Sequence, residues 1–272
     1  MTKLKTQQLL DWYGLRIRRR VEEADFPARF GMTKILRYAA QWRSQLIALT
    51  ILHENGAAIQ AGPFAGMTYV TESTEGCLAP RLLGSYESEL HPSIEAFAAS
   101  DIDTIIDIGC AEGYYAVGLA RIAPQATIYA HDIDPNAQAA CAALAAANGV
   151  AERVIVGGVF EGDDFARFAD RKVLVLMDAE GAEDALLIPE QWPSLKCMSL
   201  IVETHNMNVP GVTDRLIERF SPSHDIEVIE QAPRLTARPQ WLKNLSHLDQ
   251  LIAIWEWRAG PTPWLVMRPK SA

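Results

Sequence analysis

The chain has 272 residues, of which 49% are hydrophobic and 22% charged, and its formal net charge is −9. This composition is typical of a globular protein with one large core and an appended part, and it excludes a disordered chain. The negative charge argues against general binding to nucleic acid, because such binding comes mainly from Lys and Arg that displace counterions from phosphates.

The cysteines and the N-terminal segment indicate a compartment. Cys77, Cys110, Cys141 and Cys197 lie far apart, with neither zinc-clip spacing nor the density of a disulfide framework. The N-terminal segment lacks the apolar core of a signal peptide, and no run of about eighteen apolar residues could span a bilayer. We therefore expect a soluble, cytoplasmic protein with reduced thiols.

Residues 1–100 lack a regular alternation of strands and helices. Glycine and proline residues between Ala57 and Val70 indicate a small β-element. Before it, apolar residues at helical spacing predict an amphipathic helix that packs on the main domain or on a partner chain. They are Ile35, Tyr38, Ala39, Trp42, Leu46 and Leu49. We expect residues 1–100 to be a helical and small-β extension that acts as a cap or forms a homo-oligomer.

From about Thr104 to Glu230, short β-branched runs alternate with helical patterns. The expected strands are TIIDIG, TIYAHDI, RVIVGGVF, KVLVLMD, LIVE and IEVIE, with a final strand in PWLVM. This alternation predicts an α/β fold with a doubly wound, mainly parallel sheet, because parallel neighbours need a crossover connection. The second helix is the most clearly marked, since Asp134 can cap it, Pro135 suits its first turn and Gly149 can end it. Residues 101–272 are predicted to form the cofactor-binding domain.

The run TIIDIGCAEGYYAVGLA ends a strand in two glycines and then begins a helix. Such a loop lets the backbone approach a ligand, and the helix N-terminus offers unpaired N–H groups to an acceptor. The spacing from Gly109 to Gly113 is G-x-x-x-G, whereas a dinucleotide loop is expected as G-x-G-x-x-G. Glu112 adds negative charge where a pyrophosphate would sit. The loop therefore favours a cofactor without phosphates.

Asp132 ends the second predicted strand, nineteen residues beyond Gly113. A carboxylate at this place can accept hydrogen bonds from both ribose hydroxyls of an adenosine. Asp134 is better explained as a helix cap, and Asp132 lies too early for that role. We expect Asp132 to bind a ribose.

Four motifs occur in order between Gly84 and Glu230, and together they are more specific than one glycine loop. DIGCAEG followed by HDIDP resembles the glycine loop and ribose acid of class I S-adenosylmethionine-dependent methyltransferases. VLMDAEGAEDALL resembles the D-x-E-G-x-E signature of the FkbM-type methyltransferase family, and LIVETHN supplies an acidic residue after the fifth strand, as in that family. GSYESEL is also similar to a segment of that group.

The resemblance implies a Rossmann-like sheet of seven strands, the last antiparallel, with S-adenosyl-L-methionine across the carboxyl ends of the first strands. The rule that open α/β sheets bind ligands beyond these ends gives the same placement. By resemblance, Asp107, Gly109, Ala111 and Gly113 would form the floor under the methionine part of the cofactor.

The resemblance also implies contacts with the rest of the cofactor. Asp132 would hold the ribose, Ile133 would lie against the adenine, and the backbone around Val159 and Phe160 would border it. The Tyr-Glu segment of the family corresponds to Tyr86 and Glu87, which would reach the amino-acid end. Glu87 could equally be a surface helix residue.

Methyl transfer to a hydroxyl is helped by a base, which contributes roughly 10²- to 10⁴-fold. His205 is the best candidate, since an imidazole accepts a proton near neutrality, and its alternative is a loop histidine bonded to backbone. Asp178 and Glu180 follow the fourth strand and Glu203 ends the fifth, so these acids can converge with His205. They could bind a divalent metal ion, position a polar substrate, or, for Glu180 and Glu183, stabilise a helix N-terminus.

The expected function is O-methylation of a hydroxyl on a small molecule, such as a sugar, a polyketide or another natural product in biosynthesis. His205, Asp178 and Glu180 are the candidate catalytic residues, and no nucleic-acid or membrane partner is expected. One alternative is a catalytically silent cofactor-binding module that regulates or scaffolds a partner through its N-terminal helices. Another is an NAD(P)-dependent oxidoreductase, which the G-x-x-x-G spacing disfavours.

Overall fold

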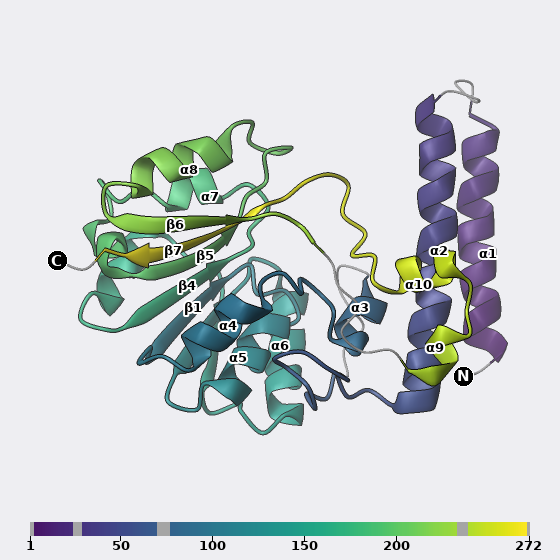
Figure 1. Ribbon diagram of the computed structural model, residues 1–272, viewed down its shortest axis with the longest axis horizontal. Coiled ribbons are helices and arrows are strands. Elements are labelled where there is room, and N and C mark those ends of the chain that lie inside the picture. Colours follow the sequence, from purple (N-terminus) through teal and green to yellow (C-terminus); the bar gives the residue numbers. More distant parts are fainter. Residues whose placement is uncertain (1–2, 24–28, 70–76, 233–238, 271–272) are drawn as a thin grey trace.

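A seven-stranded sheet forms the centre of the computed structural model, which describes residues 3–23, 29–69, 77–232 and 239–270 (Figure 1). Its strand order is β3-β2-β1-β4-β5-β7-β6. The strands are β1 (Thr104–Ile108), β2 (Thr127–His131), β3 (Val154–Gly157), β4 (Val173–Met177), β5 (Ser199–Glu203), β6 (His224–Ile229) and β7 (Trp264–Pro269). The first five strands pair in parallel, and β7 runs antiparallel to both β5 and β6. The predicted doubly wound fold with an antiparallel last strand is confirmed.

The two faces of the sheet are covered by different helices, which explains why its central strand β4 is apolar at every position. All five residues of β4 are buried. Leu174 and Leu176 face α4 (His91–Ala98), α5 (Tyr114–Ile122) and α6 (Pro135–Ala147), whereas Val175 faces α7 (Glu183–Leu186) and α8 (Val212–Phe220) (Figure 1). Side chains alternate across a strand, so each helical layer receives every second residue.

The signals at the ends of α6 act as predicted. The side chain of Asp134 accepts a hydrogen bond of 2.9 Å from the backbone N–H of Asn136, and Pro135 is the first helical residue. Gly149 follows the helix with a φ of +68°, a left-handed conformation that favours glycine. By contrast, the helical pattern predicted in DDFARFA is a 3-10 helix, Gly162–Phe168.

A hairpin of two long helices, α1 (Lys3–Val21) and α2 (Arg29–Asn55), stands beside the sheet (Figure 1). The amphipathic helix predicted here is confirmed as α2, but the side chains predicted to form its apolar face are not its most deeply buried ones. Five of those six side chains are partly buried, and Ala39 is exposed. The fully buried face instead includes Ile47 and Ile51, because α2 packs against both α1 and the short helix α3 (Leu78–Leu83). The small β-element is an isolated bridge between Ala58 and Thr68, and Val70 lies outside the described residues.

The connection from β6 to β7 leaves the sheet and reaches the hairpin. It forms α9 (Gln240–Lys243) and α10 (His247–Ala253), which lie by α2, and then returns to β7 (Figure 1). Arg43 on α2 donates two hydrogen bonds to Asp249, at 2.6 and 3.0 Å, and Arg37 donates one of 2.8 Å to the carbonyl of Trp257. These contacts fix the returning segment near the carboxyl ends of the strands. The predicted domain boundary near residue 100 stays a prediction.

None of the described helices is both long enough and apolar enough to cross a lipid bilayer.

Candidate active site

A cavity of about 470 Å³ opens beyond the carboxyl ends of β1, β2 and β4. This volume is within the range of small-molecule sites, roughly 300 to 1,000 Å³. We call it the first cavity. It lies between β1 and β4, where the strand order reverses because β1 leads to β2 and β4 leads to β5 in the opposite direction along the sheet. Open α/β sheets bind ligands at such a point. Its lining includes Gly109, Cys110, Ala111, Asp132, Ile133, Val159, Phe160, Asp178 and Glu180.

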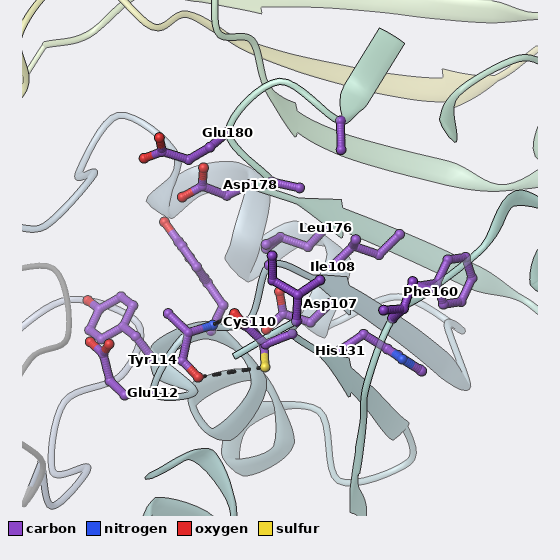
Figure 2. A pocket seen from close by; sticks show the side chains of 18 of the residues that line it. Asp107, Ile108, Cys110, Glu112, Tyr114, His131, Phe160, Leu176, Asp178 and Glu180 are labelled. Atoms are coloured by element: carbon purple, nitrogen blue, oxygen red, sulfur yellow. Dashed lines mark hydrogen bonds between the residues drawn. The ribbon is translucent and has the colours of Figure 1, made fainter. Parts of the chain in front are cut away.

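The first cavity has an acidic end and an aromatic end. Figure 2 shows the carboxylates of Asp178 and Glu180 on one side, and Phe160 with His131 on the other. Phe160 is buried and packs edge-on against His131, with ring centroids 5.0 Å apart. A ligand that fits this cavity has a flat apolar part and a part that carries hydrogen-bond donors or positive charge.

The backbone N–H groups of the glycine loop differ from expectation, since most of them are already paired. Gly109 and Cys110 both donate to the carbonyl of His131, at 2.9 and 3.0 Å, and Gly113 donates to the carbonyl of Cys110 at 2.8 Å. Ala111 donates to Oδ2 of Asp132 at 2.9 Å. The expectation that this loop presents bare N–H groups was therefore wrong for these four positions. A pyrophosphate finds few donors here.

The two glycines of the loop allow close approach of other backbone and side-chain atoms. A side chain at Gly109 would place Cβ 1.9 Å from the carbonyl oxygen of Asp178, and one at Gly113 would place it 2.7 Å from Sγ of Cys141. Both residues also have positive φ, +83° and +92°. The glycines let β1 end directly against β4 and let α5 start against α6, and this shapes the floor of the first cavity.

Asp132 lines the first cavity, as predicted for a ribose-binding residue. Oδ2 accepts from Ala111, and Oδ1 accepts a hydrogen bond of 2.8 Å from the backbone N–H of Asp134. A carboxylate has about four acceptor positions, so Asp132 can accept further bonds from a ligand. The neighbouring Ile133 is 81% exposed and Val159 is 65% exposed, although both line the cavity.

Asp107 is a buried carboxyl group in the floor of the first cavity. It is 1% exposed, and Oδ2 has no hydrogen-bond partner among the described residues. Burial raises the pKa of Asp107 to about 8, and the negative charge of Asp178 adds to this effect. A buried acceptor without a partner is costly, so a donor from a ligand would stabilise it.

Contrary to the prediction from the sequence, Glu112 does not add a free negative charge to the glycine loop. It is fully buried and pairs with the Arg81 guanidinium, while the hydroxyl of Tyr69 donates to the same carboxylate oxygen. Its charge is thus largely compensated inside the protein. Glu112 therefore repels a pyrophosphate less strongly than the sequence predicts.

Tyr86 and Glu87 differ in their position relative to the first cavity. Tyr86 lines the first cavity, whereas Glu87 is fully buried behind it and pairs with Arg258 at 2.5 Å. The hydroxyl of Tyr115 also donates to Glu87. The alternative that Glu87 lies on the surface of a helix is wrong. A direct contact of Glu87 with a cofactor stays a prediction.

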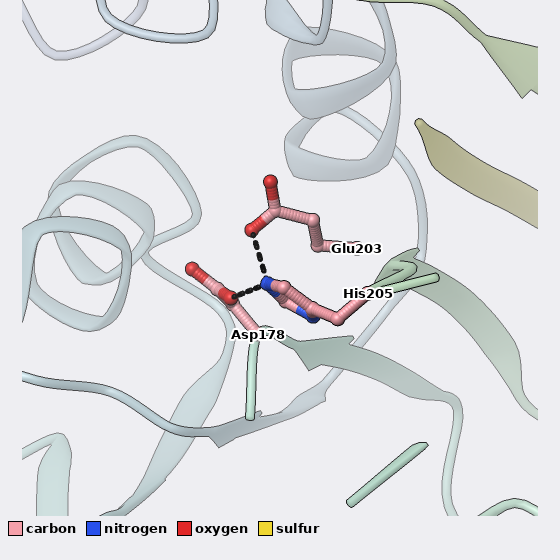
Figure 3. Close-up of side chains that lie close together, drawn as sticks. All are labelled: Asp178, Glu203 and His205. Carbon is pink, nitrogen blue, oxygen red and sulfur yellow. Dashed lines mark ion pairs between the residues drawn. The ribbon is translucent and has the colours of Figure 1, made fainter. Parts of the chain in front are cut away.

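His205 lies among three acids that come from different parts of the chain. Its Nδ1 atom is 2.6 Å from Oε1 of the fully buried Glu183. Figure 3 shows its Nε2 atom between Asp178 and Glu203, and each of these contacts is 3.5 Å long. The alternative of a loop histidine bonded only to backbone is wrong. Nδ1–H donates to Glu183, which leaves Nε2 to exchange a proton with a ligand.

The surroundings of His205 also set its proton affinity. Burial alone would lower its pKa, but the hydrogen bond to Glu183 and the charge of Asp178 outweigh it, so that the pKa is raised. Burial raises the pKa of Asp178, against the charges of His205 and Arg258. His205 is thus suited to accept a proton and to hold it.

The same group has the donor atoms of a metal site. Asp178, Glu203 and His205 bring ligand atoms within 4.8 Å of one another, and Glu180 is not part of this set. However, the Arg258 guanidinium already pairs with Glu203 and supplies the positive charge that a metal ion would bring. These residues fit proton transfer better than coordination of a cation.

A second cavity of about 380 Å³ lies next to the first. Both cavities are lined by Arg81, Tyr86, Asp178 and Glu180, so they meet at these residues. His205 lines only the second cavity of the two. Trp257, Arg258 and Glu256 complete its wall from the segment between β6 and β7.

Non-glycine residues with strained, left-handed backbone conformations lie around the two cavities. In the described chain, the non-glycine residues with positive φ are Glu87, Ala111, Glu180 and Trp257, with values from 46° to 64°. Ala111, Glu180 and Trp257 line a cavity, and Glu87 follows Tyr86, which lines both. Such conformations cost about 1 to 3 kcal/mol each and cluster at functional sites.

Sequence reasoning missed several residues of this region. Arg258 and Glu256 lie in a segment that matched no functional pattern, and Arg81 precedes every recognised motif. For Glu183 the sequence predicts only stabilisation of a helix N-terminus, although it is the last acid of the D-x-E-G-x-E signature. That signature was the available signal for its role.

Neither a family model nor a curated protein matches the sequence. Similar solved structures include the O-methyltransferase TomG from Streptomyces achromogenes in complex with SAM, at 17% identity over 66% of this chain and 81% of that chain, with a TM-score of 0.44. An rRNA methylase from Streptococcus thermophilus has 13% identity over 68% and 97%, with a TM-score of 0.46. An O-methyltransferase from Bacillus cereus in complex with SAH has 10% identity over 93% and 96%, with a TM-score of 0.44. At these low values, their substrates say nothing about the substrate of this chain.

Proposed function

We propose that this chain is an S-adenosylmethionine-dependent methyltransferase that methylates a hydroxyl group of a small molecule. One observation carries the proposal. Two cavities meet at Tyr86, Asp178 and Glu180, and a histidine held by Glu183 lines the second cavity beside this junction. One cavity can hold a methyl donor and the other an acceptor, with a base at the point where they meet.

The first cavity suits S-adenosylmethionine because its polar groups accept hydrogen bonds. Asp132 can receive the ribose hydroxyls, and the unpartnered oxygen of Asp107 can receive the amino group of the methionine part. The aromatic end with Phe160 offers an apolar surface to the adenine. A positively charged sulfonium is also favoured near Asp178 and Glu180, whereas the phosphates of NAD or NADP are not. The fold with an antiparallel seventh strand adds support.

The cofactor would supply an electrophilic methyl group on its sulfonium sulfur, and the demethylated cofactor would be a neutral thioether. The protein aligns the acceptor with this group, which can contribute roughly 7 to 11 kcal/mol. His205 takes the proton of the acceptor hydroxyl at Nε2, and Glu183 holds the imidazole in place through Nδ1. Asp178 and Glu203 stabilise the imidazolium that results.

Finer points of the proposal rest on the sequence. The segment from Asp178 to Glu183 supports an FkbM-type relationship, because its last acid contacts the proposed base. The net charge of −9 favours a small-molecule acceptor, as in a biosynthetic pathway, over nucleic acid. A cytoplasmic location and a homo-oligomer formed through α1 and α2 are proposed on sequence grounds alone.

Calorimetric titration of the full chain tests binding of the cofactor, and we expect S-adenosylmethionine and S-adenosylhomocysteine to bind. A thermal-shift measurement tests dinucleotides, and we expect NAD and NADP to leave the unfolding midpoint unchanged. No heat with either of the first two ligands, or clear protection by a dinucleotide, would contradict the proposal. A silent module would bind the cofactor, but it would give no methylated product from any acceptor, and His205→Ala would change nothing.

A further inference from the structure

We infer that the second cavity binds the methyl acceptor and selects small molecules that carry a protonated amine together with hydroxyl groups, against their anionic analogues. This inference rests on the proposed methyltransferase function and names its substrate class. It follows from the charges of the cavity wall and from how each of them is paired.

The position of the second cavity makes it the acceptor site. It meets the first cavity at Tyr86, Asp178 and Glu180, where a transferred methyl group would have to pass. His205 lines the second cavity, so a hydroxyl bound there can reach its Nε2 atom. With a volume of about 380 Å³, the cavity has room for a molecule the size of a monosaccharide.

The positive charges of the wall are already paired with acids of the protein. Arg258 lies 2.5 Å from Oε1 of Glu87 and 3.0 Å from Oε2 of Glu256, and its Nη1 atom contacts Glu203 and Thr262. Four contacts thus engage one guanidinium, which has only five N–H donors. The other arginine of the wall, Arg81, pairs with Glu112. Neither arginine is arranged to receive a ligand carboxylate or phosphate.

Two acids of the wall, Asp178 and Glu180, are by contrast accessible from the cavity. The side chain of Asp178 is 24% exposed, and its carboxylate has only the 3.5 Å contact with His205 as an ion pair among the described residues. Glu180 is exposed at the rim, and its carboxylate forms neither a hydrogen bond nor an ion pair within the described part of the chain. These oxygens accept hydrogen bonds, and they repel a second negative charge.

Trp257 also lines the cavity. Its indole N–H donates a hydrogen bond of 3.2 Å to Ser44 on α2, which fixes the ring. Aromatic rings attract ammonium groups through their quadrupole. Accessible carboxylates, an aromatic residue and paired arginines together fit an amino alcohol or an amino sugar better than a sugar acid.

Three matched probes with one ring test this selectivity. Glucosamine, glucose and glucuronate would be titrated into the full-length protein saturated with S-adenosylhomocysteine, at a pH that keeps the amine protonated. We expect glucosamine to bind at least about tenfold more tightly than glucose, and glucuronate to bind most weakly. Equal affinities, a preference for glucuronate, or no binding of glucosamine would overturn the inference.

Carboxylate-to-amide variants locate the selectivity. Glu180→Gln should reduce the preference for glucosamine about threefold to fivefold, as is typical of an exposed charge pair, and Asp178→Asn should reduce it further. Glu152→Gln changes an exposed acid away from both cavities and should leave the preference unchanged. If neither Glu180→Gln nor Asp178→Asn alters the preference, the inference is wrong. Failure of S-adenosylhomocysteine itself to bind would instead count against the proposed function.

Discussion

Oε1 of Glu183 lies 2.6 Å from Nδ1 of His205, and the Glu183 side chain is fully buried. The backbone N–H of Gly181 donates to the same oxygen at 3.1 Å, which holds the carboxylate in place. Glu183 thus orients the imidazole from behind, and Nε2 remains on the side of the second cavity. This is the relation of an orienting acid to a catalytic base.

Replacing His205 should stop proton transfer but leave cofactor binding intact. In His205→Ala, we expect turnover to fall roughly 10²- to 10⁴-fold, because a general base typically contributes that much. The affinity for S-adenosylhomocysteine, measured by calorimetry, should stay within about twofold of the original. Loss of cofactor binding together with turnover would mean that His205 supports the fold of the site, which contradicts its role as base.

The pH dependence of turnover should carry the signature of Glu183. The base acts in its neutral form, so turnover rises as pH increases through the pKa of His205, which is raised above its ordinary value of 6.5. Glu183→Gln replaces the charged acceptor of this hydrogen bond by a neutral one and so removes the negative charge that raises this pKa. The acidic limb of the kcat profile should therefore shift to lower pH, with a turnover loss of about tenfold. An unchanged limb would show that another group controls it.

Asp132 should matter for cofactor affinity. Asp132→Ala removes the proposed partner of the ribose hydroxyls and should weaken binding of S-adenosylhomocysteine roughly 10- to 100-fold, the effect of one or two charged hydrogen bonds. Asp134→Ala is a matched control, since it removes the cap of α6 and costs about 1 kcal/mol of stability. Calorimetric affinities should separate the two variants. Equal effects of both changes would assign Asp132 to the structure of the loop.

The sheet could be predicted from the sequence because the apolar pattern of each strand is a local feature of the chain. Each quoted run overlaps one observed strand, and the runs of β1 to β4 contain the whole strand. The cap of α6 is likewise readable from Asp134 and Pro135. The cavity position also follows, since the carboxyl ends of parallel strands meet at one edge. Asp132 and Asp178 were predicted to lie there in this way, because each directly follows a strand of the parallel part of the sheet.

The electrostatics of the site could not be predicted, because pairing depends on residues far apart in the chain. Arg258 contacts Glu87 across 171 positions, and Arg81 contacts Glu112 across 31. No local pattern shows that a carboxylate such as Glu112 has a buried counter-ion. The paired N–H groups of the glycine loop were missed for a related reason, since their acceptors include a neighbouring strand.

Removal of divalent ions should leave turnover nearly unchanged. Asp178, Glu203 and His205 lie close enough for a metal ion, but Arg258 pairs with Glu203 and provides the positive charge there. Exhaustive dialysis against a chelator, followed by an assay in metal-free buffer, should therefore keep activity within about twofold. A large loss that Mg²⁺ or Mn²⁺ restores would show that a cation displaces Arg258, and proton transfer to His205 would then need revision.

Cofactor binding should release a proton from Asp107. Burial raises the pKa of this carboxyl group to about 8, so at pH 7 it is mostly protonated in the empty protein. A bound ammonium or sulfonium favours the ionised form and lowers that pKa, and the proton leaves. Affinity for S-adenosylmethionine should therefore increase as pH rises toward 8 and then level off.

Calorimetry in two buffers with different ionisation enthalpies measures this proton directly. The heat of binding should differ between the buffers in proportion to the released protons, and Asp107→Asn should remove the difference. Glu87 is the main competing source, because burial raises its pKa to about 7. Release that persists in Asp107→Asn but disappears in Glu87→Gln would place the cofactor's positive charge nearer to Glu87. The unpartnered oxygen of Asp107 would then lie outside the contact with the amino group.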